Sequence, residues 1–193
     1  VYKRQEMDVD DSSTEIPELI GRQLADIDFL LPNDDDLTYC LIELDAGSLQ
    51  FLLDNIDKFA DPMARTLCWS TAWEMTRAGT MRARDFIQLV ARGMQAETEL
   101  AVLERIVLQA SNALKNYADP RWAAQSTLLA DALLDGARSS DAQRSIICTQ
   151  ALVKIRLHDS ARDYLRGVLE SSEDAGLRWS ALAALAADGA IED

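Results

Sequence analysis

The sequence contains a single histidine, His158, among its 193 residues. The H-E-x-x-H signature of zinc peptidases needs two histidines one helical turn apart, together with a glutamate that acts as the general base. This chain therefore excludes that motif. It also lacks a Walker loop, a G-x-S-x-G elbow and a G-x-G-x-x-G turn. No residue is assigned a catalytic, cofactor-binding or metal-binding role from the sequence.

Basic residues are scarce, with 19 Lys and Arg against 33 Asp and Glu, so the formal net charge is −14. Such a surface repels phosphate backbones and anionic lipids, which argues against nucleic-acid binding and membrane docking. No apolar run approaches the length of a membrane span. Glycine and proline are also few, at 8 and 4 residues, while hydrophobic residues make up 48%. This composition favours a helical protein with a substantial core.

The three cysteines, Cys40, Cys68 and Cys148, lie far apart among apolar residues and form no C-x-x-C pair. An odd number of well-separated cysteines does not indicate a disulfide framework. We predict buried, reduced thiols in a cytosolic protein, and therefore a cytoplasmic location.

A lone histidine rarely suffices for catalysis or for a metal site. We interpret His158 as a cation near a helix end or as a solvated linker residue. Trp69 and Trp73 are one helical turn apart, a spacing that fits either core packing or the wall of a pocket, and core packing is favoured.

The acidic run from Asn33 to Asp36 suggests calcium at first sight. An EF-hand loop requires glycine at its sixth position and glutamate at its twelfth. Counted from Asp34, those positions hold Tyr39 and Asp45, so the match fails. The run is interpreted as a solvated turn.

Other charged residues carry little information in so acidic a chain. Glu97 and Glu99 form a pair of neighbouring carboxylates, and such pairs are abundant here. Arg82, Arg84 and Asp85 are expected to form a surface ion network, which is the usual fate of such clusters.

The beginning of the chain lacks helical periodicity. Residues 1–5 resemble the translated end of a transposon adapter used in sequencing libraries, although an ordinary basic strand start is the alternative. In the stretch 6–46, Pro17 and Pro32 interrupt regular structure. Residues 37–44 carry Thr, Tyr, Cys and Ile, and their alternation predicts a strand.

From Ser48 onward the periodicity is helical. Aspartates at 61, 119, 141 and 159 predict helix caps, and Gly79 and Gly189 predict helix ends. The predicted helices cover 48–59, 62–77, 83–94, 98–118, 120–136, one from 141, one from 159, and 177–187. About eight helices joined by short links predict an irregular α-helical solenoid of the HEAT or armadillo type, preceded by a short β segment. The array shows no polar capping element at its far end, so the domain at 47–193 is interpreted as truncated.

Several stretches carry a resemblance to a known family. The segment 31–39, Leu-Pro-Asn-Asp-Asp-Asp-Leu-Thr-Tyr, followed by Leu44-Asp45, is its most specific part. Looser matches follow in order at 64–69, 72–77, 84–86, 97–99 and 177–179. Together they resemble the C-terminal helical domain of bacterial aminopeptidase N enzymes, especially the actinobacterial type, over most of residues 15–190.

The resemblance implies a non-catalytic fragment of a zinc-dependent aminopeptidase that removes N-terminal residues from peptides. Residues 6–46 would end a β-sandwich domain and form the junction strand. The helical domain would enclose the peptide cavity and limit substrate access. Zinc and all catalytic residues would lie in a catalytic domain upstream, so the expected partners are the catalytic and β-sandwich domains of the same polypeptide and a peptide substrate. One alternative is a free-standing helical-repeat adaptor that binds other proteins, which the composition supports equally well. Another is a lone domain that complements a separately encoded catalytic chain.

Overall fold

The computed structural model describes residues 6–9, 12–21, 23 and 27–190. In these residues nine α-helices and three short 3-10 helices occur and no strand is present. The α-helices are α1 (Ala46–Asn55), α2 (Pro62–Ala78), α3 (Ala83–Gly93), α4 (Leu100–Asn116), α5 (Pro120–Gln125), α6 (Leu128–Ala137), α7 (Ala142–Leu152), α8 (Asp159–Ser171) and α9 (Ala175–Ala187). The 3-10 helices are η1 (Pro17–Leu19), η3 (Asp34–Asp36) and η4 (Ile56–Lys58). The predicted all-α class is confirmed. The adapter-like residues 1–5 lie outside the described residues.

Aspartates begin most of the helices, because a carboxylate satisfies backbone N–H groups that have no partner within the first turn. Asp45, Asp61, Asp119, Asp141 and Asp174 each accept such hydrogen bonds. Two of these helices, α2 and α5, also start with proline, whose missing N–H costs nothing at that position. The caps predicted at 61, 119 and 141 are confirmed.

Two details of the predicted helices are wrong. The helix predicted over 120–136 is two helices, because Ser126 adopts an extended conformation (φ −81°, ψ 124°) and ends α5. Serine and threonine compete for backbone hydrogen bonds and favour such breaks, and the Thr127 hydroxyl donates to Asp131. Asp159 is the first residue of α8, while His158 is its N-cap residue and makes no side-chain cap bond.

Glycines end α2 and the last helix as predicted. Gly79 has φ +80° and donates its N–H to the carbonyls of Met75 and Thr76, which closes α2. Gly189 has φ +70° just beyond α9. Only glycine adopts this left-handed conformation without a steric penalty from Cβ.

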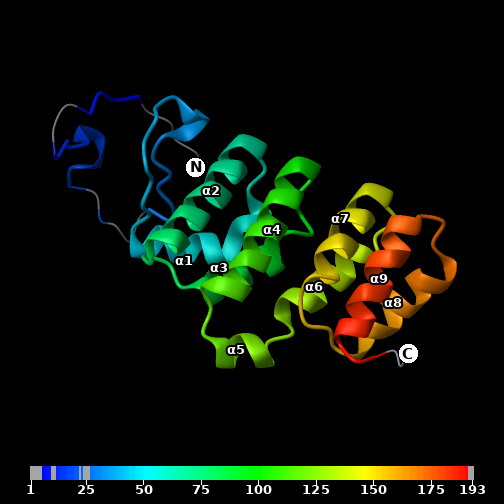
Figure 1. The fold of residues 1–193 in the computed structure, drawn as a ribbon. Helices are drawn as coiled ribbons and strands as arrows, with labels where there is room; N and C mark the ends of the chain where they lie inside the picture. Colours follow the sequence, from blue (N-terminus) through cyan, green and yellow to red (C-terminus); the bar gives the residue numbers. More distant parts are fainter. Residues whose placement is uncertain (1–5, 10–11, 22, 24–26, 191–193) are drawn as a thin grey trace.

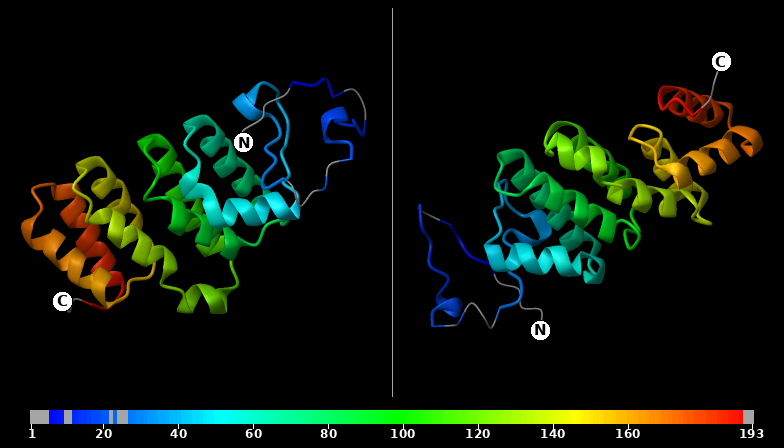
Figure 2. Two further views of the ribbon diagram at one scale, coloured as in Figure 1. Left: turned by 180° about the vertical axis from the view of Figure 1, so that it is seen from behind. Right: turned by 90° about the horizontal axis from the view of Figure 1, so that it is seen from below.

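The helices pack in consecutive pairs, α3 with α4, α6 with α7, and α8 with α9 (Figure 1). Each pair stacks on the next, since α6 and α7 contact α3 and α4, and α8 and α9 contact α6 and α7. The result is an elongated array with α1 to α4 at one end and α8 and α9 at the other (Figure 2). The assignment to a HEAT or armadillo solenoid stays a prediction.

One continuous apolar core runs through this array, from Leu44 beside α1 to Leu185 in α9. Helices α6 and α7 approach each other closely at Gly136. A Cβ built on Gly136 would lie 2.4 Å from the Cys148 sulfur. The absence of a side chain at position 136 therefore lets the two helices approach.

The strand predicted over 37–44 is absent from this structure. The segment 27–45 instead runs in two lengths beside α2, joined by the turn at η3 (Figures 1 and 2). A strand needs a partner to receive its backbone hydrogen bonds, and residues 39–44 form no backbone–backbone hydrogen bond with any described residue.

Candidate functional site

The turn before residue 38 is held by one side chain. Asn33 Nδ2 donates to the Thr38 carbonyl at 2.7 Å, and the Thr38 N–H donates to Asn33 Oδ1 at 2.9 Å. Asn33 adopts a left-handed conformation (φ 55°), which asparagine tolerates better than most residues. Asp35 and Asp36 have positive φ as well. The acidic run is a turn, as predicted.

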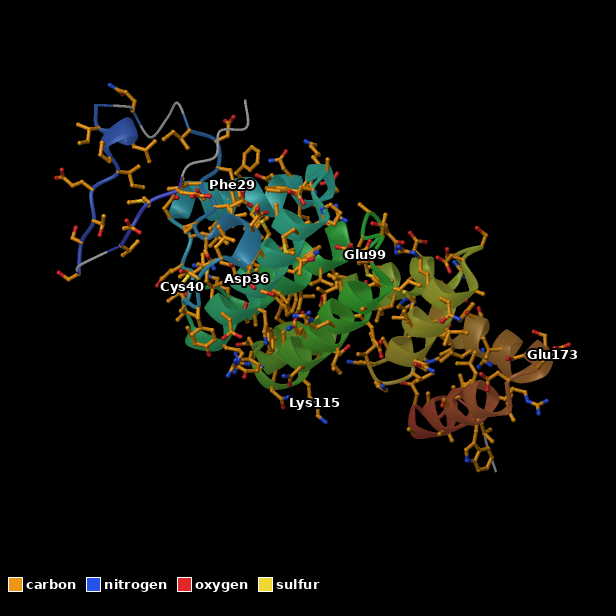
Figure 3. The ribbon with its side chains drawn as sticks, turned by 90° about the horizontal axis from the view of Figure 1, so that it is seen from above. Phe29, Asp36, Cys40, Glu99, Lys115 and Glu173 are labelled. Atoms are coloured by element: carbon orange, nitrogen blue, oxygen red, sulfur yellow. The ribbon has the colours of Figure 1, made fainter. Side chains whose placement is uncertain are left out.

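This turn directs one side of the following segment outward. Leu37, Tyr39 and Leu41 lie at every second position and are 70%, 109% and 73% exposed. Ile42 and Leu44 point the other way, since Ile42 packs against the core and Leu44 is buried. We call the exposed set Leu37, Tyr39 and Leu41 the apolar ledge. Cys40 is also exposed and lies at the outer edge of the segment (Figure 3).

The ledge combines two properties that are rare on the solvent-facing surface of a folded protein. Three large apolar side chains at alternate positions face solvent, and the backbone of residues 39–44 forms no backbone–backbone hydrogen bond within the described part of the chain. Grouped apolar exposure marks a surface that binds another protein part. An extended segment with free backbone groups is also a ready template for strand addition. The ledge is therefore a candidate docking surface.

A buried ion pair fixes the helices next to this segment. Arg65 in α2 donates from Nε to Glu97 Oε2 at 3.0 Å and from Nη2 to Glu97 Oε1 at 3.1 Å. The Arg65 side chain is 7% exposed and the Glu97 side chain 1%. Arg65 Nη1 also donates to the Phe59 carbonyl at 2.6 Å, and Nη2 to Thr98 Oγ1 at 3.3 Å. The guanidinium thus connects the N-terminal end of α2 to the link between α3 and α4.

Two further donors complete the hydrogen bonding of the Glu97 carboxylate. Trp69 Nε1 donates to Oε2 at 3.0 Å, and the Glu99 N–H donates to Oε1 at 3.0 Å. Burial by itself raises the pKa of Glu97, but the hydrogen bonds from Arg65, the Glu99 N–H and Trp69 outweigh it, so the pKa lies below its usual value. The hydrogen bond to Glu97 raises the pKa of Arg65 against the opposing effect of burial. Both groups are charged.

A second arginine ties the same link to α7. Arg144 Nη1 donates to the Met94 carbonyl at 2.8 Å, and Nη2 donates to the Glu97 carbonyl. Sequence reasoning missed both arginines and gave Glu97 no weight. The partners are 32 and 47 positions apart, so no local spacing reveals them. The one signal was that stretches 64–69 and 97–99 both carried the family resemblance.

Trp69 and Trp73 belong to the core, as predicted. Trp69 is 2% exposed, and the Trp73 ring packs against Phe86 and Tyr117 with centroid distances of 5.5 and 5.8 Å. His158 lies in the link between α7 and α8, with Nε2 3.1 Å from Asp131 Oδ1. It is a linker residue, only partly exposed.

The remaining predicted residues are scattered over the surface and the core. Arg84 pairs with Asp85 at 3.5 Å on an exposed part of α3. The prediction of three buried cysteines is wrong for Cys40, because that side chain lies in the outward-facing segment. Cys68 and Cys148 are buried and free, and burial raises the pKa of these thiols to about 12 and about 11.

No group of three or more metal-binding side chains comes together in the described residues. Among the described residues, no set of side chains fits the four-ligand shell of a zinc ion. No described helix combines the length and the hydropathy that a bilayer-crossing segment needs. The features of the described residues that bear on function are the candidate docking surface and the buried Arg65–Glu97 pair.

Comparison with known proteins identifies the family to which this helical array belongs. The ERAP1-like C-terminal domain family matches residues 29–193, which include the ledge, the ion pair and all nine described α-helices. The chain belongs to this family. Aminopeptidase N of Streptomyces lividans is similar to it, with 31% identity over 198 residues. That match covers 96% of this chain and 23% of the relative, so the chain spans about a quarter of the length of the curated relative. The resemblance found in the sequence is confirmed.

Within an ERAP1-like C-terminal domain, the ledge lies near the start of the family match. The match begins at residue 29, whereas the similarity to the aminopeptidase covers nearly the whole chain. Most of the residues before 29 therefore share the aminopeptidase similarity and lie outside the family match. The ledge at 37–41 lies close to that boundary.

Proposed function

We propose that this chain is the non-catalytic C-terminal domain of a zinc-dependent aminopeptidase that removes N-terminal residues from peptides. The observation that carries the proposal is the family match over the entire helical array, together with the similarity to an aminopeptidase over 96% of the chain. The zinc ion and the residues that perform the hydrolysis belong to a catalytic domain elsewhere in the polypeptide. No step of the reaction is assigned to a residue of this chain.

The proposed role of the helical array is to enclose the peptide cavity and limit which substrates enter it. Stacked helix pairs form extended surfaces suited to this role. An enclosed cavity excludes bulky or folded substrates. The Arg65–Glu97 pair supports the role because it links the start of α2 to the segment between α3 and α4. The free cysteines are consistent with a cytoplasmic enzyme.

The ledge is the proposed contact with the preceding β-sandwich and catalytic domains of the same polypeptide. Residues 6–46 then form the junction, and residues 37–44 receive their strand partners from the preceding domain. This arrangement would explain why residues 37–44, despite their clear strand alternation, have no strand partner among the described residues.

The test uses the longer polypeptide encoded by the source gene. We expect chelator-sensitive cleavage of an aminoacyl anilide by that polypeptide, and neither cleavage nor stoichiometric zinc in the 193-residue chain. Substituting Leu37→Ser, Tyr39→Ser and Leu41→Ser together in the longer polypeptide should loosen domain docking. Cleavage of long peptides should then rise relative to cleavage of the anilide. Leu108→Ser, at another exposed leucine in α4, is the matched control.

Two results would contradict the proposal. Peptidase activity of the pure 193-residue chain would show that a different chemistry operates here. A longer polypeptide without any aminopeptidase activity would favour the alternative, an adaptor whose ledge binds separate proteins.

A further inference from the structure

Helices α8 and α9 are packed against each other more firmly than against the rest of the array. They contact each other extensively, whereas α8 meets α6 and α9 meets α7 at few places (Figure 1). Arg162 in the first turn of α8 donates from Nε to Asp188 Oδ2, just beyond the end of α9, and from Nη1 to Asp159 Oδ1. The two helices therefore form one structural unit, the α8–α9 pair.

The joint between the two preceding helix pairs is built differently. There α3 contacts α6 and α4 contacts α7 extensively. Arg144 of α7 donates to the carbonyls of Met94 and Glu97 across this joint. Gln95 Nε2 donates to the Ala132 carbonyl of α6 at 2.9 Å. Hydrogen bonds from a charged guanidinium are roughly twice as strong as neutral ones, so this joint is the firmer of the two.

One neutral side chain provides the hydrogen bonds between the α8–α9 pair and the helices before it. The Tyr164 hydroxyl lies 2.9 Å from Thr149 Oγ1 in α7 and 3.0 Å from the Ala137 carbonyl at the end of α6. In the part of the chain that the structure describes, no other residue of α8 or α9 hydrogen-bonds to α6 or α7. Tyr164 is therefore the main polar contact across this joint.

The link between α7 and α8, residues 153–158, adds one weak contact. His158 Nε2 lies 3.1 Å from Asp131 Oδ1, but the two groups are not aligned as a hydrogen bond and the Asp131 side chain is 60% exposed. Such half-exposed contacts contribute little to stability. The link itself contains turns and irregular backbone. Short irregular links of this kind are where hinge motions take up their changes in backbone angles.

The apolar contribution that opposes separation is also modest. The buried residues of the pair are Ala161, Leu165 and Val168 in α8 and Ala181 and Leu185 in α9. Helix α3 alone buries six residues, including Phe86 and Ile87. Because apolar stabilisation scales with the buried area, the α8–α9 pair is held less strongly than the helices before it.

We propose that α8 and α9 open as one unit about the link 153–158, and that the hydrogen bonds of the Tyr164 hydroxyl hold the closed position. Opening separates this hydroxyl from Ala137 and Thr149 and leaves α1 to α7 folded. In an array of stacked pairs each pair contacts only its neighbours, so one loose joint changes the curvature without unfolding the remainder. The inference depends on the array and not on the proposed peptidase activity.

Amide hydrogen exchange of the 193-residue chain, followed by mass spectrometry of its peptides, tests the inference. Exchange resolves local opening in units that are smaller than the whole protein. We expect amides of α8 and α9 to exchange at least about tenfold faster than those of α3 and α4. The rates in α8 and α9 should be raised by similar factors, because the two helices open together.

Tyr164→Phe removes the hydroxyl and should speed exchange in α8 and α9 by a further factor of about three to ten, the share of one neutral hydrogen bond in such an equilibrium. Exchange in α1 to α4 should not change. The variant leaves no buried polar group unpaired. Ser145 Oγ still donates to the Ala137 carbonyl at 2.6 Å, and Thr149 Oγ1 still donates to the Ser145 carbonyl at 2.7 Å.

Tyr117→Phe is the matched control. The Tyr117 hydroxyl has no hydrogen-bond partner among the described residues, and its ring packs against Trp73 far from this joint. The same change there should leave exchange in α8 and α9 as it is. Thr149→Val should act like Tyr164→Phe, and the double variant should speed exchange by less than the product of the two factors, because both changes break the same bond.

Each of the following results would overturn the inference. Equal exchange in all helices would show that the joint does not open separately. Fast exchange in α9 with slow exchange in α8 would mean that the end of the array frays and that the pair does not move as a unit. An unchanged rate in Tyr164→Phe, or an equal rise in α1 to α4, would show that the Tyr164 hydroxyl does not hold this joint.

Discussion

Arg65 and Glu97 lie 32 positions apart in the sequence and form a two-pronged ion pair with N–O distances of 3.0 and 3.1 Å. Both side chains are almost completely buried. Every oxygen of the carboxylate accepts two hydrogen bonds, counting those from Trp69 and the Glu99 N–H. The pair connects the start of α2 with the link between α3 and α4.

Breaking this pair should destabilise the chain strongly. Glu97→Gln preserves the shape of the side chain but leaves the Arg65 charge buried without a counter-charge. We expect a loss of about 3–5 kcal/mol in the free energy of unfolding, measured by urea titration. Glu99→Gln, at an exposed neighbour, should change it by less than about 0.5 kcal/mol. The paired change Arg65→Met with Glu97→Leu should cost less than the sum of the single changes. A loss below about 1 kcal/mol for Glu97→Gln would contradict the structural importance of the pair.

The same carboxylate should make stability depend on pH. Because the folded state lowers the pKa of Glu97 below its ordinary value of 4.5, the folded state favours the charged form. Its contribution is complete above pH 4.5 and is lost as the pH falls through the lower pKa of the folded state. Urea titrations between pH 7 and pH 3 should therefore show the gap between the natural chain and Glu97→Gln narrowing below about pH 4.5. A gap of constant size over that range would contradict this assignment.

Replacing two helical glycines by alanine should have opposite effects on stability. Gly136→Ala puts a Cβ 2.4 Å from the Cys148 sulfur, so α6 and α7 must separate, and we expect a loss of about 1–3 kcal/mol. Gly167→Ala meets open space in α8 and should gain up to about 1 kcal/mol from its higher helix propensity. Thermal unfolding of both variants checks the contrast. Adding Cys148→Ala to Gly136→Ala should recover part of the lost stability. Equal effects of alanine at the two glycines would contradict the close contact between Gly136 and Cys148.

The three thiols should differ sharply in reactivity. Cys40 is exposed, whereas burial raises the pKa of Cys68 to about 12 and of Cys148 to about 11. A thiol-specific disulfide reagent at pH 8 should therefore label one cysteine per native chain quickly and all three in denaturant. Cys40→Ser should remove the fast phase. Fast labelling that survives this substitution would mean that a buried thiol is accessible.

Much of the fold could be predicted because its signals are local. Asp61 before Pro62 and Gly79 after Ala78 set the ends of α2, and each acts through hydrogen bonds within a few residues. The sequence did not predict the break at Ser126. Serine and threonine are weak helix formers, but they end a helix only where tertiary packing favours a turn of the chain. The strand predicted at 37–44 is not formed in this structure. A strand depends on a partner strand, and the local sequence does not show whether one is present.

The sequence by itself determined the helical class, most helix ends, the family and the exclusion of a zinc-peptidase motif, because these depend on residue type and on spacing within a few turns. Only the tertiary structure decided that Arg65 meets Glu97, that Gly136 lies against Cys148, and which apolar side chains stay uncovered. Leu37, Tyr39, Leu41 and Trp179 have the same residue types as core positions. Their exposure follows from long-range packing, which brings distant segments together and leaves these side chains uncovered by any other described residue.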